Sequence, residues 1–199
     1  MARTDVLELD YPAGSRNNHY FEVIMLAYVF VIFAVAFRFL PNTLGFAAVT
    51  ASLLFFGARG SRRQMWFPLA LMAASDLFLT RIIYEYPFTW DHYVTWVWYA
   101  AILWVGTCLR GNIKPVRVIV AALASSLSFF LLSNFAFWTT GIMYPRTLDG
   151  LLTCYTAALP FFRRGVEGDL LFTCAMFATP VLGHYLAGVL GKTDHTAAA

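Results

Sequence analysis

The chain has 199 residues, of which 60% are hydrophobic and only 13% are charged. Soluble domains have about 45–50% apolar and about 25% charged residues, so this chain has too few charged side chains to cover a water-exposed surface. Together with a formal net charge of only +3, the composition argues against a disordered chain and against a nucleic-acid-binding protein. It predicts an integral membrane domain whose surface faces a lipid bilayer.

Stretches nearly free of charged residues predict the membrane-spanning helices, because a helix needs about 20 apolar residues to cross a hydrocarbon core about 30 Å thick. Residues 1–19 lack the apolar segment of a signal peptide and predict a polar tail, and residues 191–199 predict a second one. Between them, residues 20–190 predict a single, all-α, polytopic transmembrane domain. Its six expected spans are residues 20–37, 39–58, 64–84, 93–109, 115–138 and 170–190.

Two stretches depart from the pattern of a regular span. Pro41, Asn42 and Gly45 occupy the start of the second span and indicate a short or partly unwound segment there. A long connection, residues 139–167, follows the fifth span. Its apolar part, residues 151–162, is too short to cross a bilayer. We therefore expect an interfacial or re-entrant helix that ends near Pro160, before the last span.

The distribution of Arg and Lys predicts the orientation, because cytoplasmic loops of membrane proteins are enriched in these residues. With the N-terminus inside, nine basic residues lie on the cytoplasmic side and five on the outer side. The short basic loops 58–63 and 110–117 give the clearest signal. The sequence thus predicts a multi-pass protein of a bacterial inner membrane with both termini in the cytoplasm.

Polar residues in the outer half of the bundle are candidate binding residues, since a charge in the membrane is costly and usually faces a cavity or a partner. Asp76 is the most deeply placed carboxylate, roughly 18 Å from the inner boundary at a rise of 1.5 Å per residue. Two interpretations stay open for it: a substrate or ion site, or a structural ion pair with Arg38 or Arg81. The candidate substrate-binding residues are Arg38, Asn42, Asp76, Asn134, Trp138, Tyr144 and Asp169.

Aromatic residues surround the end of the fifth span. An amide such as that of Asn134 can hydrogen-bond a ligand while neighbouring rings stack on it. Trp138 and Tyr144 would alternatively belong to the aromatic belt at the outer interface. Small residues at 47–52 and 121–126 predict close packing between helices.

Cofactor and enzyme chemistry have little support in the sequence. His184 would be placed to ligate a tetrapyrrole, although a hydrogen bond to a neighbouring helix is the more common role of such a histidine. No cofactor is predicted. The sequence contains no Walker motif, nucleophile elbow or HExxH motif. No enzymatic activity is predicted, and energy from ATP would have to come from another chain.

Several motifs follow one another along the chain: RFLPN at 38–42, ASLLFFG at 51–57, PLALMAASDLFL at 68–79, SNFAFW at 133–138, MYPRT at 143–147, GLLTCYTAALPFF at 150–162 and GDL at 168–170. Together they resemble a family of bacterial membrane proteins assigned to transport and related to the substrate-binding S components of energy-coupling factor (ECF) transporters. The resemblance covers about residues 20–190. It implies an S-component-like bundle that binds a vitamin-like small molecule from the outside, with an energising ATPase module as a partner.

A second hypothesis is an accessory subunit of a larger membrane complex, photosynthetic or respiratory. The first span lacks the Ala-xxx-Ala face with which S components commonly dock on the energising module, and this favours the second hypothesis. Co-purification with pigment or redox subunits would distinguish the two.

Overall fold

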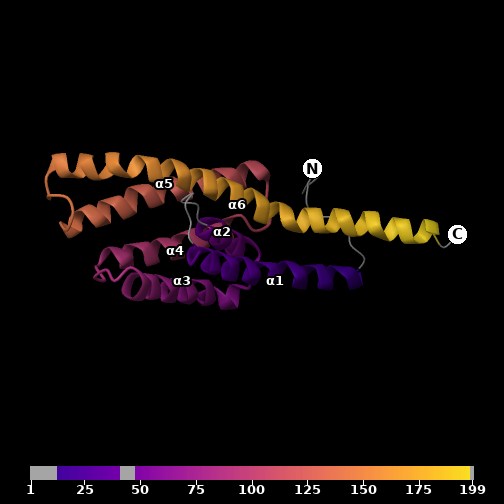
Figure 1. Ribbon diagram of the computed structural model, residues 1–199. Helices are drawn as coiled ribbons and strands as arrows, with labels where there is room; N and C mark the ends of the chain where they lie inside the picture. The colour runs from indigo at the N-terminus through magenta and orange to yellow at the C-terminus, as the bar shows by residue number, and fades with distance from the viewer. Residues whose placement is uncertain (1–12, 41–47, 198–199) are drawn as a thin grey trace.

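The computed structural model describes the backbone of residues 13–40 and 48–197, and the side chains of residues 20–40 and 48–186 (Figure 1). These ranges contain helices and no strand, which confirms the predicted all-α class. The helices are α1 (Ala13–Arg38), α2 (Val49–Arg59), α3 (Trp66–Phe78), α4 (Asp91–Cys108), α5 (Pro115–Thr140) and α6 (Leu148–Ala197). A short η1 (Arg62–Gln64) precedes α3, and a π-helical turn, η2 (Leu79–Ile83), continues it.

Four stretches in the described residues are long and apolar enough to cross a membrane: Tyr20–Arg38, Arg62–Ile83, Pro115–Thr140 and Leu148–Leu186. The first three agree with predicted spans. The predicted number of six is not confirmed, because α2 has only 11 residues and α4 is not among the four stretches. The chain is nevertheless a membrane protein by the length and composition of its apolar helices.

Helix α2 forms the centre of the bundle (Figure 1). Ten of its 11 residues are buried, and it contacts α1, α4, α5 and α6. A helix that is apolar all round is stable only when other helices cover every face. The short segment predicted after Pro41 is thus confirmed, whereas Asn42 and the rest of residues 41–47 lie outside the described residues.

Helix α6 differs from the prediction. Residues 151–162 do not form a separate interfacial helix that ends near Pro160, because one continuous helix of 50 residues contains both Pro160 and Pro180. A proline removes one backbone hydrogen bond, which packing neighbours can compensate within a membrane helix. The charged stretch between the two predicted segments also stays helical. There Arg163 and Glu167 form an exposed ion pair at 3.1 Å, one turn apart.

The helix ends extend into the predicted polar tails. Helix α1 already begins at Ala13 and α6 continues to Ala197. At 1.5 Å per residue α6 is about 75 Å long, more than twice the thickness of a hydrocarbon core. The start of α1 and the end of α6 extend toward the same side of the bundle (Figure 1).

Helices α2 and α4 approach each other closely at two glycines. A Cβ atom on Gly106 would lie 2.5 Å from the carbonyl oxygen of Leu54 and 2.9 Å from the Cα atom of Gly57. Only glycine allows two helix backbones to come this near. The predicted small-residue faces also pack inside the chain, as the complete burial of Ser52 and Ala122 shows.

Two basic loop residues that predict the topology also hold helix ends. The Arg110 guanidinium donates to the carbonyl oxygens of Gly57 (2.6 Å) and Gly60 (2.9 Å), at the end of α2. Arg117 donates to the carbonyl oxygen of Cys108 (3.2 Å), at the end of α4, and to that of Asn112 (3.0 Å), in the connection that follows. Cations at these positions satisfy carbonyl groups that have no partner within the helix.

Candidate functional site

A pocket of about 480 Å³ lies between α2, α4, α5 and α6, with the end of α1 also on its wall. Most of the wall is apolar, and six aromatic side chains contribute to it: Trp98, Tyr99, Phe129, Phe130, Phe161 and Phe162. Its few polar groups come from Arg38, Thr50, Tyr99, Ser126, Ser133, Asn134 and Asp169. A concave, mostly apolar site with a few polar groups, in the range of about 300–1,000 Å³, is typical of small-molecule binding.

Asp76 lies beside this pocket in a saturated polar cluster. Its Oδ1 atom forms an ion pair with Arg38, and the residue is 6% exposed. Trp96 donates to Oδ2 at 3.0 Å and the Tyr99 hydroxyl donates to Oδ1 at 3.3 Å. Arg38 also donates to the Ser75 hydroxyl at 2.8 Å. Of the two ion-pair partners that the sequence left open, the structure selects Arg38.

Arg81, the other candidate partner of Asp76, lies elsewhere. Its guanidinium carbon is 6.0 Å from the centre of the Phe88 ring, a cation–π distance. Arg81 belongs to η2, the π-helical turn that follows the turn of Asp76. Of the two candidate partners, Arg38 therefore forms the ion pair with Asp76, and Arg81 contacts an aromatic ring.

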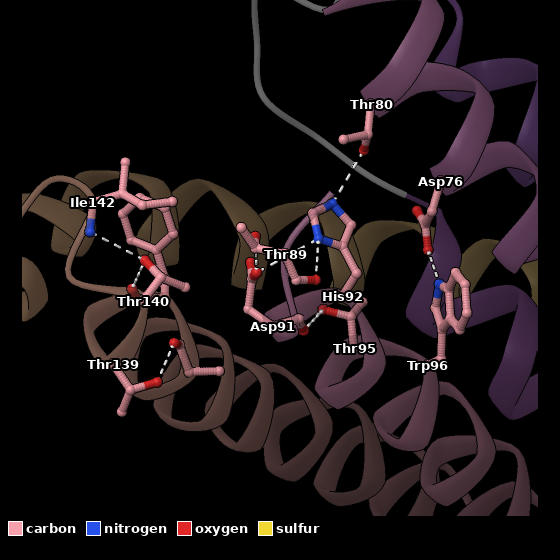
Figure 2. A network of polar contacts seen from close by, with 12 residues as sticks. Asp76, Thr80, Thr89, Asp91, His92, Thr95, Trp96, Thr139, Thr140 and Ile142 are labelled. Carbon is pink, nitrogen blue, oxygen red and sulfur yellow. Dashed lines mark hydrogen bonds and ion pairs between the residues drawn. The ribbon is translucent and has the colours of Figure 1, made fainter. Parts of the chain in front are cut away.

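A second polar network fixes the start of α4 against η2 (Figure 2). The His92 ring contacts the Thr80 hydroxyl at 3.1 Å through Nε2 and the Thr89 carbonyl oxygen at 3.1 Å through Nδ1. The Thr89 hydroxyl donates to Asp91, the first residue of α4. These contacts hold α4 in place, and Trp96 reaches Asp76 one turn further along (Figure 2).

Asp169 lies on the pocket wall in a different environment. The residue is 8% exposed, and its Oδ2 atom accepts a hydrogen bond of 2.6 Å from Ser126. The hydroxyl of Thr50, in the first turn of α2, also interacts with this carboxylate. Among the side chains that the structure describes, no Arg, Lys or His forms an ion pair with Asp169.

The other predicted binding residues divide into two groups. Asn134 lines the pocket, and its Nδ2 atom donates to the carbonyl oxygen of Phe130 at 2.7 Å. Trp138 and Tyr144 are not on the pocket wall. Trp138 donates to the carbonyl oxygen of Pro145 at 3.0 Å, and Tyr144 packs edge-on against Phe137 with ring centroids 6.3 Å apart.

Trp138 and Tyr144 lie at the sharp turn from α5 to α6. Gly141 ends α5 in the left-handed region, with a φ of 69° that favours glycine. Around it, the Thr139 and Thr140 hydroxyls donate to carbonyl oxygens of their own helix, and the Ile142 amide donates to the Thr140 hydroxyl at 3.4 Å (Figure 2). The arrangement stabilises the turn.

The hydroxyl partners of Asp169 were not predicted from the sequence. Thr50 and Ser126 both fall in the small-residue faces that we interpreted as packing surfaces. The sequence did contain a signal for these partners, because each hydroxyl lies on a helix face that is otherwise mostly apolar. A further buried hydroxyl, that of Thr173, lies one turn after Asp169 and has no hydrogen-bond partner within the described part of the chain.

His184 lies on α6, outside the residues that line the pocket. No group of three or more His, Cys, Asp or Glu side chains that could hold a metal ion occurs in the described ranges. The tetrapyrrole considered for His184 stays a prediction.

The chain was compared with known protein families, curated proteins and solved structures. Residues 18–186 match a family described as a family of unknown function, DUF6580. No curated protein and no solved structure matches the chain. The similarity to S components thus stays a prediction. Because the match includes every pocket residue and most of the chain, this protein belongs to the DUF6580 family of unknown function.

Proposed function

We propose that the protein binds a small molecule in the pocket between α2, α4, α5 and α6. One observation carries this proposal: a pocket of about 480 Å³ with aromatic walls and a few polar groups, in a bundle of apolar helices. Two of the stretches long enough to cross a membrane, Pro115–Thr140 and Leu148–Leu186, supply eleven of its sixteen lining residues. The ligand would therefore bind at membrane depth.

We further propose a role in transport across a bacterial inner membrane, with both termini in the cytoplasm. The support is the resemblance to S components and the excess of basic residues in the short loops. Because the sequence contains no ATP-binding motif, an ATPase module in another chain would supply the energy. Binding would not require that module, so the two parts of the proposal can be tested separately.

The test uses the full chain in lipid nanodiscs and a panel of vitamins, amines, nucleosides and carboxylates. Thermal-shift measurements identify a binder, and calorimetry measures its affinity. Gly165 lines the pocket, and a Cβ atom there would have no heavy atom within 4 Å. Gly165→Leu places a larger side chain at this open position, and we expect at least about a tenfold loss of affinity, or about 1.4 kcal/mol.

Gly183→Leu is the matched control. Gly183 lies on the same helix, also has no atom within 4 Å of an added Cβ, and does not line the pocket. This variant should bind as the wild-type chain does. A panel with no binder, or a binder that Gly165→Leu does not affect, would refute the proposal.

Purification in mild detergent tests the second hypothesis at the same time. A stable stoichiometric complex with pigment or redox subunits would favour an accessory role in a larger membrane assembly. Recovery of the chain alone, with a small molecule bound, would favour the binding function.

A further inference from the structure

Asp169 determines the net charge of the pocket wall. Arg38 also lines the pocket, but Asp76 neutralises its charge and Ser75 accepts a further hydrogen bond from it. The described partners of Asp169 are the neutral hydroxyls of Ser126 and Thr50. When Asp169 is ionised, the wall thus carries one uncompensated negative charge.

A buried carboxylate is unfavourable unless a cation accompanies it or a cavity admits one. Asp169 is 8% exposed and lies on the wall of a cavity. The negative charge of Asp169 that has no positive partner therefore lies next to the open space of the pocket. An anionic ligand would meet this charge without a free cation to offset it, since Arg38 is already paired.

The aromatic wall provides a second attraction for positive charge. The faces of aromatic rings attract cations through the ring quadrupole, and the attraction is stronger when water is excluded. Two aromatic pairs line the pocket: Trp98 with Phe129, at a centroid distance of 4.7 Å, and Phe130 with Phe162, at 4.5 Å. A carboxylate together with aromatic faces suits an ammonium group that carries an apolar body.

We infer that the ligand of this pocket is an organic cation, an amine or a quaternary ammonium compound, whose charged group lies against Asp169 and whose apolar part contacts the rings. The inference rests on the proposed function, because it names the ligand class of the same pocket. Ser126 and Thr50 orient the carboxylate toward the ligand.

Three probes with the same phenyl group and nearly the same length test the charge preference: 2-phenylethylammonium, 2-phenylethanol and 3-phenylpropanoate. Each is titrated calorimetrically into the full chain in nanodiscs of zwitterionic lipid, and empty nanodiscs provide the blank. We expect the cation to bind about tenfold more tightly than the alcohol, and the anion to bind most weakly.

Asp169→Asn keeps the shape of the side chain and removes its charge. In this variant the preference for the cation over the alcohol should fall from about tenfold to about twofold, because only the weaker attraction of the aromatic rings remains. Asp149→Asn removes the same charge from an exposed position in the first turn of α6. This control should keep the preference, and Asp169→Glu should keep most of it.

The outcomes separate the inference from the proposed function. Suppose that the probes bind and that Gly165→Leu weakens their binding. If the cation is then not preferred, or if Asp169→Asn keeps the full preference, the inference about the ligand class is wrong, but the proposed binding pocket is supported. If none of the three probes binds, the inference is again wrong, and the wider panel decides on the pocket. Should Asp169→Asn fail to fold, the charge series on the wild-type chain still decides the preference.

Discussion

Two buried carboxylates of similar exposure have opposite surroundings. Asp76 is 6% exposed and Asp169 is 8% exposed. Asp76 accepts hydrogen bonds from Arg38, Trp96 and Tyr99, so both of its oxygens have donors. Asp169 has only hydroxyl partners and lies on a cavity wall. The comparison teaches that burial alone does not distinguish the two carboxylates, whereas the presence or absence of an opposite charge does.

The packing of the helices also differs from place to place. Helices α2 and α4 are in backbone contact at Gly57 and Gly106. Helix α6 leaves open space at Gly165, on the pocket wall. The bundle therefore combines a tight helix contact with a cavity.

The largest expected effect comes from breaking the ion pair. Asp76→Ala leaves the Arg38 guanidinium buried without its counter-charge, and the free energy of unfolding should fall by about 3–5 kcal/mol. Asp169→Asn should change it by less than about 1 kcal/mol, because the amide still accepts from Ser126 and no buried partner is left charged. Unfolding by denaturant in detergent micelles, followed by near-ultraviolet circular dichroism, measures both values.

A double variant, Arg38→Met with Asp76→Leu, serves as the control for the ion pair. It removes both charges, so much of the stability that Asp76→Ala loses should return. Equal effects of Asp76→Ala and Asp169→Asn would contradict the distinction between the two carboxylates.

Two glycines test the difference in packing. Gly106→Ala would place a Cβ atom 2.5 Å from the carbonyl oxygen of Leu54, and the resulting separation of α2 and α4 should cost about 1–3 kcal/mol. Gly165→Ala meets no atom within 4 Å and should be neutral or stabilising by up to about 1 kcal/mol, because alanine favours the helix. Thermal unfolding of both variants under the same conditions provides the comparison. A stable Gly106→Ala chain would show that the helices can separate without loss.

The sequence was sufficient for those features that depend on local composition. Hydropathy predicts the spans that include α1, α3 and α5, and the rarity of intramembrane charge singles out both Asp76 and Asp169. Pro41 and Gly45 predict a short second helix because they are poor helix formers at their positions.

Features that depend on contacts between residues far apart in the chain could not be predicted from the sequence. The choice of Arg38 over Arg81 follows from the packing of α1 against α3, which no local pattern encodes. Pro160 predicts a helix end by the usual rule, but α6 contacts α2 and α5, and this packing supports a helix that propensity alone would interrupt. The aromatic pocket wall was hidden among 19 Phe residues, since ring composition does not show which rings surround a cavity.

The smallest expected effect concerns Tyr99, which belongs to both regions because it lines the pocket and donates to Asp76 at 3.3 Å. Tyr99→Phe removes one hydrogen bond while Trp96 and Arg38 still hold the carboxylate, so the free energy of unfolding should fall by about 1 kcal/mol. Combined with Asp169→Asn, the two effects should add within about 0.5 kcal/mol, because the two residues share no hydrogen-bond partner.

The matched control combines Tyr99→Phe with Trp96→Phe. These two side chains donate to the same carboxylate, so their double-mutant cycle should give a coupling above about 0.5 kcal/mol. A comparable coupling between Tyr99 and Asp169 would instead show that the two carboxylates belong to one network. The ion pair would then form part of the binding site, because a ligand held by Asp169 would also act on Asp76 through the shared tyrosine.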